Sequence, residues 1–315
     1  CVTRGREGKA LTDMAELAKA GVMGFSDDGS PVADGSVMRQ ALERAASLGL
    51  PIINHCEEPG LSRGGVMNHG ALANSLGLRG SPASAEEVMV ARDVALAGKT
   101  GGRLHLAHLS AAGSVGLVRR AKARGIPVTA EVTPHHLTLT EEWVKTKPGL
   151  PQPYDTNAKV NPPLRTQRDV DALVQGLKDG TIDCIATDHA PHTLADKAGT
   201  FQEAAFGISG LETALGLLMA LVHDGHLDMV TLVERLTAGP ARIVNMPEVC
   251  SGSLRPGSPA DVTIFDTRET WIVDTSKFAS RGRNTPLEGA TLRGKVMATI
   301  VDGCVVYIDE AVKVG

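Results

Sequence analysis

Four short segments of the sequence carry the histidines and acidic residues that could do chemistry. Each segment contains or follows a run of apolar residues, and together they supply Asp27-Asp28, His55, His108 and Asp188. Two imidazoles and two carboxylates that converge from separate strands suit zinc. Two such ions lying close together would suit hydrolysis through a bridging hydroxide. The residue types therefore predict a metal-dependent hydrolase.

Two of these segments also allow a simpler interpretation. Asp188 ends the apolar stretch 182–187, where an isolated carboxylate would be costly unless it were paired, metal-bound or catalytic. The alternative for Asp188 is that it caps the following turn. Asp27-Asp28 precede Gly29 and on their own could form only a turn, because aspartate tolerates the backbone conformations of turns.

The remaining histidines and acidic pairs are predicted to be structural or solvated. His105 and His108 are three positions apart in the predicted strand 104–109, so only one of them should point into a barrel. His108 lies at the end of that strand and is the better ligand candidate. We expect His135-His136 to be structural and Glu57-Glu58 to lie in a solvated loop.

The elements that must position these residues alternate between strands and helices over residues 1–249. This alternation predicts β/α units and a parallel sheet, with the polar residues at the strand ends as in a TIM barrel. No G-x-G-x-x-G motif follows a strand, which disfavours a doubly wound dinucleotide-binding fold. In the helix predicted over 84–97, Ser84 and Glu87 indicate a capping box. The predicted strands are 22–25, 51–55, 104–109, 127–132 and 182–187, and the other predicted helices are 36–48, 114–124, 168–178, 211–222 and 229–236.

Residues 250–315 have a different pattern of short alternating runs separated by turns. Strands are predicted over 261–265 and 297–301, and Asp302-Gly303 predicts a hairpin into a strand over 304–307. We therefore predict an α/β fold with a TIM-type (β/α)₈ barrel over 1–249 and part of a small β-sandwich over 250–315.

Composition excludes several classes of protein. The 315 residues include 32 Lys and Arg against 36 Asp and Glu, a net charge of −4 that disfavours a broad nucleic-acid-binding face. No apolar run approaches the roughly 18 residues needed to cross a bilayer. The five cysteines are scattered and form no C-x-x-C, which argues against a disulfide framework and favours the cytoplasm.

Taken in order, the motifs resemble those of the amidohydrolase superfamily and most closely those of class I bacterial dihydroorotases. The resemblance covers essentially the whole chain. The motifs are Phe25-Ser26-Asp27-Asp28-Gly29, Asn54-His55-Cys56-Glu57, His108-Leu109-Ser110, Asn161-Pro162-Pro163-Leu164-Arg165, Thr187-Asp188-His189-Ala190-Pro191-His192 and Phe206-Gly207-Ile208-Ser209-Gly210-Leu211-Glu212-Thr213.

The resemblance implies a zinc enzyme of de novo pyrimidine biosynthesis. In this family a metal-bound hydroxide attacks the dihydroorotate ring, and the reverse reaction closes N-carbamoyl-L-aspartate. It implies one or two zinc ions, a small-molecule substrate, a homo-oligomer and a possible aspartate transcarbamoylase complex. Spacing does not decide between Asp27 and Asp28, and we choose Asp28. The implied zinc ligands are Asp28, His55, His108 and Asp188, with Asp188 also the catalytic acid and base; the implied substrate-binding residues are Asn161, His192, Phe206 and Gly207.

One part of the family pattern is missing from this sequence. The family's first barrel strand carries His-x-His-x-Arg, and no H-x-H occurs here before Asp28. We therefore expect an N-terminally incomplete barrel that lacks its first two strands. Hydantoinase, dihydropyrimidinase and allantoinase are alternatives, but they generally carry a lysine near the position of Asp28. An inactive structural partner of aspartate transcarbamoylase is another, although such chains usually lose the zinc ligands that remain here.

Overall fold

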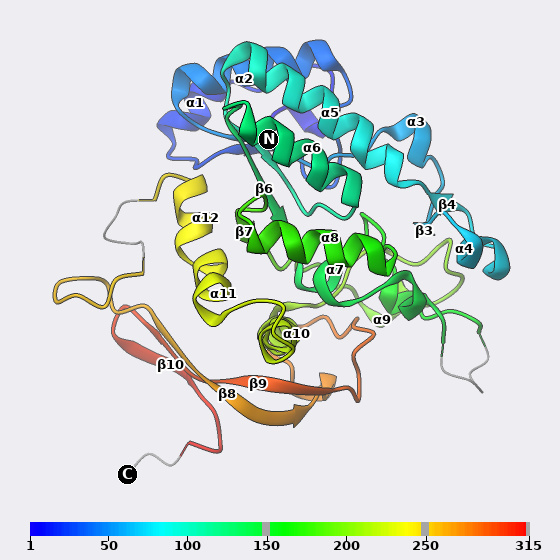
Figure 1. The fold of residues 1–315 in the computed structure, drawn as a ribbon, viewed down its shortest axis with the longest axis vertical. Helices are drawn as coiled ribbons and strands as arrows, with labels where there is room; N and C mark the ends of the chain where they lie inside the picture. The colour runs from blue at the N-terminus through cyan, green and yellow to red at the C-terminus, as the bar shows by residue number, and fades with distance from the viewer. Residues whose placement is uncertain (147–151, 247–251, 313–315) are drawn as a thin grey trace.

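The computed structural model describes residues 1–146, 152–246 and 252–312, and its centre is a parallel sheet. The sheet has five strands in the order β1-β2-β5-β6-β7, and all four neighbouring pairs run parallel. Figure 1 labels the last two of these strands, β6 and β7. A single parallel bridge between His189 and Ile208 continues the arrangement beyond β7. The strands are β1 (Phe25–Ser26), β2 (Ile52–Asn54), β5 (Leu104–Leu106), β6 (Val128–Val132) and β7 (Cys184–Ile185).

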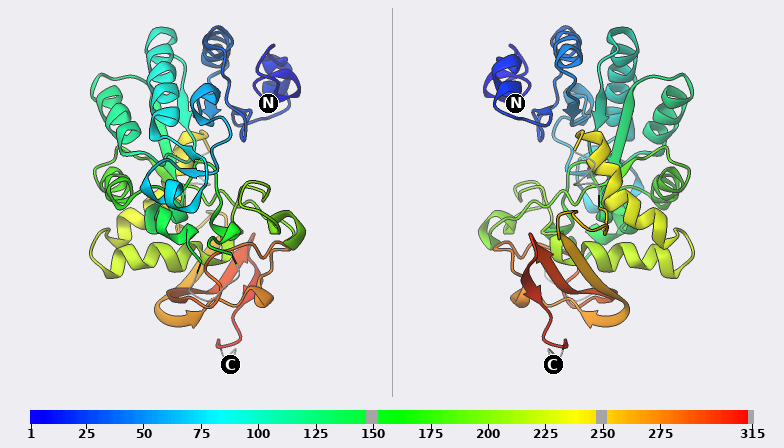
Figure 2. Two further views of the ribbon diagram at one scale, coloured as in Figure 1. Left: turned by 90° about the vertical axis from the view of Figure 1, so that its right-hand side faces the viewer. Right: turned by 90° about the vertical axis from the view of Figure 1, so that its left-hand side faces the viewer.

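Helices cover the outer face of this sheet in the order in which they follow the strands. Helix α2 packs on α5, α5 on α6 and α6 on α8, so the helices form an arc around the strands (Figure 2). The strands and helices predicted for residues 22–236 are thus confirmed, with shifts of a few residues at their ends. The covering helices are α2 (Gly35–Leu48), α5 (Ala83–Thr100), α6 (Ala112–Ala123), α8 (Gln167–Lys178), α10 (Leu211–His223), α11 (Met229–Leu236) and α12 (Ala238–Ile243).

The sequence of α2 shows how these helices are specified. Asp34 caps its first turn by accepting hydrogen bonds from the backbone N–H groups of Ser36 and Val37. The helix ends at Gly49, whose φ of 70° gives the left-handed conformation that terminates helices. Its buried residues, Met38, Ala41, Leu42 and Ala45, recur at helical spacing and face the core.

The capping box predicted for α5 is wrong. The helix begins at Ala83, before Ser84, and Pro82 at its cap makes no side-chain hydrogen bond. One residue before Glu87, the Glu86 side chain is buried and accepts hydrogen bonds from the backbone N–H groups of Ser110 and Ala111. The first turn of α5 therefore supports the loop after β5 rather than its own terminus.

An antiparallel sheet follows the helical part of the chain. It contains β8 (Val262–Ile272), β9 (Thr291–Val301) and β10 (Cys304–Ile308) in the order β10-β9-β8, and α10 packs against β9 (Figure 1). Asp302 and Gly303 have φ of 49° and 76°, as the predicted hairpin turn requires. The boundary expected between residues 249 and 250, and Cys250 itself, lie outside the described residues, so the domain division stays a prediction.

Short elements complete the chain, and in its described parts no helix is long and apolar enough to span a membrane. They are η1 (Arg4–Arg6), α1 (Met14–Lys19), α3 (Pro59–Ser62), β3 (Met67–Asn68), α4 (Ala71–Leu76), β4 (Gly80–Ser81), α7 (Pro134–Thr138), η2 (Glu141–Val144), η3 (Thr156–Ala158), α9 (Leu194–Lys197) and η5 (Thr275–Lys277).

Candidate metal centre and active site

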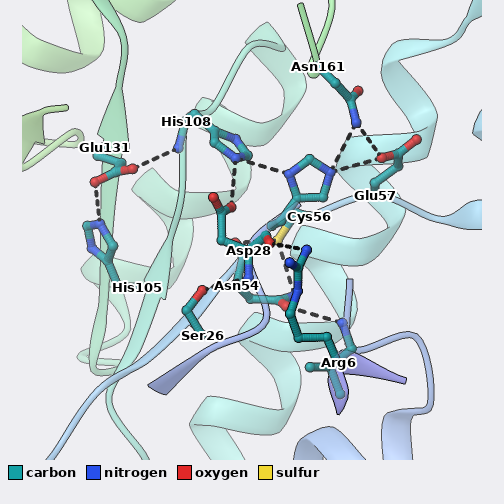
Figure 3. A network of polar contacts seen from close by, with 12 residues as sticks. Arg6, Ser26, Asp28, Asn54, Cys56, Glu57, His105, His108, Glu131 and Asn161 are labelled. Carbon is teal, nitrogen blue, oxygen red and sulfur yellow. Dashed lines mark hydrogen bonds and ion pairs between the residues drawn. The ribbon is translucent and has the colours of Figure 1, made fainter. Parts of the chain in front are cut away.

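Three side chains from three neighbouring strand ends meet in one cluster, the Asp28–His55–His108 triad. His55 Nδ1 lies 3.0 Å from His108 Nε2. The same His108 nitrogen lies 3.3 Å from Asp28 Oδ1, and Figure 3 shows these two side chains facing each other. One ligand atom from each residue lies within 4.8 Å of the others, close enough to share a metal ion. Both histidines are buried, whereas the Asp28 side chain is half exposed.

The parallel sheet explains why residues so far apart in the sequence meet. Asp28, His55 and His108 follow β1, β2 and β5 by one or two residues, and these strands are adjacent and point the same way. Their carboxyl ends therefore form one rim, as in barrel enzymes. His108 lies beyond the end of β5 with a φ of 33°, a conformation that few residues other than glycine adopt.

Strand alternation does not relate His105 to His108, because β5 ends at Leu106, and the expectation that only one of them points into the barrel stays a prediction. His105 Nε2 lies 3.1 Å from Glu131 Oε2, and the His108 backbone N–H donates to Glu131 Oε1 at 3.3 Å. Both residues thus contact the same carboxylate from β6. His105, Glu131 and Cys184 form the second group of possible metal-binding side chains in the described part of the chain.

The structure gives Asp27 and Asp28 different surroundings. Asp27 is buried, and its carboxylate accepts hydrogen bonds from the backbone N–H groups of Val2 and Thr3 and from the Thr3 hydroxyl. Asp28 instead faces His108. Asp27 therefore holds Val2 and Thr3 against the end of β1, and Asp28 is the better placed of the two to act as a metal ligand.

Glu57 does not lie in a solvated loop, which corrects that expectation. Its Oε2 atom is 2.9 Å from His55 Nε2 and accepts a hydrogen bond from Asn161 Nδ2 at 2.8 Å. Burial raises the pKa of Glu57, but hydrogen bonds from His55, Ser62 and Asn161 outweigh it and lower that pKa to about 2. Its place in the motif Asn54-His55-Cys56-Glu57 was the signal in the sequence that could have found it. Glu58, by contrast, caps α3 through Gly60.

The charges around the triad favour a cation at its centre. The hydrogen bond from His108 lowers the pKa of Asp28 to about 2. Burial opposes a charge on His108, but Asp28, Asp188 and Glu131 together raise its pKa to about 9. A positive charge placed between these carboxylates is therefore stabilised.

Asp188 is not one of the three residues whose ligand atoms lie close enough together to share a metal ion. It follows β7 with a φ of 48° and is half-buried. Burial raises its pKa, the charges of Asp28 and Glu131 add to this effect, and His108 and His55 oppose it. Asp188 follows β7 by three residues, and β7 runs parallel to β6, so Asp188 lies at the same rim of the sheet as the triad.

Three of the four predicted substrate-binding residues, His192, Phe206 and Gly207, lie in two segments that are connected by hydrogen bonds. His192 Nε2 lies 2.8 Å from the Phe206 carbonyl oxygen. A Cβ on Gly207, which has a φ of 138°, would lie 2.5 Å from the Ala190 Cβ, so only glycine fits. Asn284, which the sequence did not single out, donates to the carbonyl oxygens of Ala190 and Gly207 and accepts from the His192 N–H.

A pocket of about 360 Å³ has Glu57, Asn161 and Phe206 among its lining residues, and Glu57 contacts His55 of the triad. The structure thus brings Asp28, His55 and His108 into contact and connects them to Asn161 through Glu57. His135 and His136 are buried, and His136 contacts Thr133 and the carbonyl of Pro162, consistent with the structural role expected for them.

Comparison with known proteins agrees with this arrangement. A family model described as Dihydro-orotase-like matches residues 1–114, and the Amidohydrolase family model matches residues 68–307. The dihydroorotase of Syntrophus aciditrophicus is 51% identical over 309 residues, which cover 98% of this chain and 70% of that protein. The dihydroorotase of Pelotomaculum thermopropionicum is 52% identical over 313 residues, covering 99% and 71% of the two chains.

Solved structures share the fold. Dihydropyrimidinase from Brevibacillus agri NCHU1002 superposes with a TM-score of 0.80 at 21% identity, covering 94% of this chain and 66% of that one. L-hydantoinase from Arthrobacter aurescens superposes with a TM-score of 0.81 at 25% identity, covering 96% and 68%.

Fold and site together define an enzyme of the amidohydrolase superfamily, a hydrolase of cyclic amides with an α/β barrel architecture and a candidate metal site. Within that superfamily the chain belongs to the dihydroorotase family. It spans about 70% of the length of the two curated relatives described above.

Proposed function

We propose that the protein catalyses the reversible cyclisation of N-carbamoyl-L-aspartate to L-dihydroorotate and water, in de novo pyrimidine biosynthesis. The observation that carries this proposal is the convergence of Asp28, His55 and His108 at one rim of the sheet, in a chain 51% identical to a dihydroorotase. Asp28 also supplies a carboxylate near the position where the family resemblance implies a lysine in hydantoinase-like enzymes.

The donor set of the triad fits zinc. Glu57 can only accept a hydrogen bond, so His55 Nε2 carries the proton and its Nδ1 lone pair faces His108 and Asp28. Two imidazole nitrogens and one carboxylate are ligands that zinc prefers. Zinc bound there would polarise the ring carbonyl and lower the pKa of water.

Asp188 is proposed as the group that moves the proton. Its raised pKa and its place beside the triad suit a carboxylate that accepts a proton from water as the water adds to the ring carbonyl. The same carboxyl group then returns the proton to the ring nitrogen as the amide bond breaks. In the direction of cyclisation these transfers run in reverse.

The substrate is proposed to lie beside the triad, in the pocket that Glu57, Asn161 and Phe206 line. Asn161 is held at one side by Glu57, and His192 and Gly207 are held at the other by Asn284. Hydrogen-bond donors at these positions would bind the carboxylate and the ring amide of dihydroorotate.

Removal of either histidine ligand tests the metal assignment. In the full-length protein, His55→Ala and His108→Ala should each lower the zinc-to-protein ratio and the dihydroorotase activity together. His226→Ala, which changes an exposed histidine after α10, is the matched control. An unchanged zinc ratio in both ligand variants would show that the two histidines are structural.

A neutral substrate analogue tests the carboxylate site. His192→Ala should raise KM strongly for dihydroorotate and much less for dihydrouracil, the same ring without the carboxylate. Equal kcat/KM for the two compounds in the unaltered protein would mean that the carboxylate is not recognised. A dihydropyrimidinase-like activity would then be the better assignment.

A homo-oligomer, association with aspartate transcarbamoylase and a cytoplasmic location are also proposed, and family resemblance is their support. Light scattering of the protein alone and mixed with aspartate transcarbamoylase would test the first two.

A further inference from the structure

Two lysines near the pocket are buried. Lys159 is 2% exposed and Lys197, the last residue of α9, is 5% exposed. Burial lowers the pKa of both side chains to about 8, and for Lys197 the charge of Lys159 adds to this effect while Asp155 opposes it. Burying an ammonium group costs free energy, so two buried lysines near each other in space are expected to have a structural or functional role.

Both ammonium groups donate to backbone carbonyls of the segment 202–207, which ends with Phe206 and Gly207. The Gly207 N–H in turn donates to the Lys159 carbonyl oxygen at 2.8 Å. The segment is therefore fastened along its length to the stretch that leads into Asn161. The four Nζ–carbonyl distances are 3.1 Å from Lys159 to Gln202, 2.6 Å from Lys159 to Ala204, 2.8 Å from Lys197 to Ala205 and 3.1 Å from Lys197 to Gly207.

The charge of Lys159 also reaches the pocket wall. Its Nζ lies 4.3 Å from the centre of the Phe206 ring, within the range of a cation–π contact. The ring is 39% exposed and lines the pocket. Carbonyl dipoles satisfy the ammonium N–H groups without cancelling their net charge, so a positive potential extends towards whatever occupies the pocket.

We propose that Lys159 and Lys197 are positioning residues that hold the segment 202–207 against the pocket and make the pocket selective for an anionic ring over a neutral one. The inference rests on the proposed function, because it assumes that the substrate lies beside Phe206. It assigns part of the recognition of the substrate charge to groups that do not contact the substrate.

Charge-removing variants of the full-length zinc-loaded protein test the inference. Lys159→Met and Lys197→Met should each raise KM for dihydroorotate about tenfold, the scale of one lost charge interaction. The kcat and the zinc-to-protein ratio should stay near those of the unaltered protein. KM for dihydrouracil should change less than about threefold, because a neutral ring does not respond to the lost charge. Lys178→Met, at the exposed end of α8, is the matched control.

Equal changes of KM for the two compounds would overturn the inference, since the lysines would then support the fold only, and so would no change for either compound. If a Met variant does not fold, Lys197→Gln retains N–H donors without the charge, and the same comparison of the two substrates decides. If the unaltered protein does not turn over dihydroorotate, the proposed function fails instead.

Discussion

At the triad, the Glu57 carboxylate determines which ring nitrogen of His55 faces His108. Glu57 lies 2.9 Å from His55 Nε2 and thereby turns Nδ1 towards His108. Carboxylates that orient a ligating imidazole in this way fix its tautomer and raise its basicity. Glu57 also accepts a hydrogen bond from Asn161, so it links the triad to a residue that we propose binds the substrate.

Glu57→Gln should therefore weaken zinc binding while leaving the fold intact. Loss of such an orienting carboxylate typically costs about 10- to 100-fold in metal affinity or activity. Competition with a zinc chelator measures the affinity. Glu58→Gln, at a carboxylate that only caps α3, is the control. Equal zinc affinity in the two variants would show that Glu57 does not orient His55.

Asp188→Asn should be the most damaging single change to turnover. The variant keeps the shape of the side chain but cannot carry the proton, and general acid–base catalysis is worth about 10² to 10⁴ in rate. Steady-state kcat for dihydroorotate measures the effect. A variant that retains a tenth of the original turnover would refute the catalytic role.

The buried lysines should make stability depend on pH above neutrality. Lys197 has a pKa of about 8 in the folded protein, whereas an unfolded chain keeps the ordinary value of about 10.4. Between these values the unfolded state binds a proton that the folded state does not, so rising pH favours folding. The free energy of unfolding of the unaltered protein, relative to that of Lys197→Met, should therefore rise from pH 8 to pH 10 in urea titrations. If the difference in unfolding free energy between the two proteins stayed flat or fell over this pH range, Lys197 would not have a lowered pKa in the folded protein.

At the scale of elements, the first turn of α5 holds the loop that presents His108. Buried Glu86 accepts hydrogen bonds from the N–H groups of Ser110 and Ala111 and from the Ser110 hydroxyl, and Arg165 Nε donates to that hydroxyl at 3.1 Å. Removing one member of such a buried network leaves the others unsatisfied.

Glu86→Ala should destabilise the protein by about 2–4 kcal/mol, because it leaves buried donors without acceptors. Chemical denaturation measures the loss. The control is Glu43→Ala on α2, where an exposed pair with Arg39 contributes at most about 1 kcal/mol. A loss no larger than that of the control would show that water replaces the carboxylate.

Sequence patterns predicted the helices and strands well where the prediction depends on hydrophobic periodicity and on turn residues that are close together in the sequence. The β/α alternation and the Asp302-Gly303 hairpin depend on neighbouring residues and are confirmed. The contacts of Glu57 with His55 and of His105 and His108 with Glu131 were missed, because they depend on where β2 and β5 end in three dimensions. A shift of two residues at a strand end changes which side chains meet.

At the scale of the whole molecule, the direction of the parallel strands explains the site. Residues separated by 80 positions, such as Asp28 and His108, meet because their strands share a direction and a rim. Asn284 connects the segment before β9 to His192, which follows β7 and is proposed to bind the substrate, a contact across 92 positions. No pattern in the sequence indicates that second contact, since Asn284 carries no chemistry of its own.

The position of zinc can be observed directly by anomalous diffraction at the zinc absorption edge from crystals of the full-length protein. The proposal predicts an anomalous peak for a zinc ion that is coordinated by Asp28 Oδ1, His55 Nδ1 and His108 Nε2. A peak at the His105–Glu131–Cys184 group instead, or no peak at the triad in zinc-loaded and active crystals, would contradict the assignment of the metal centre.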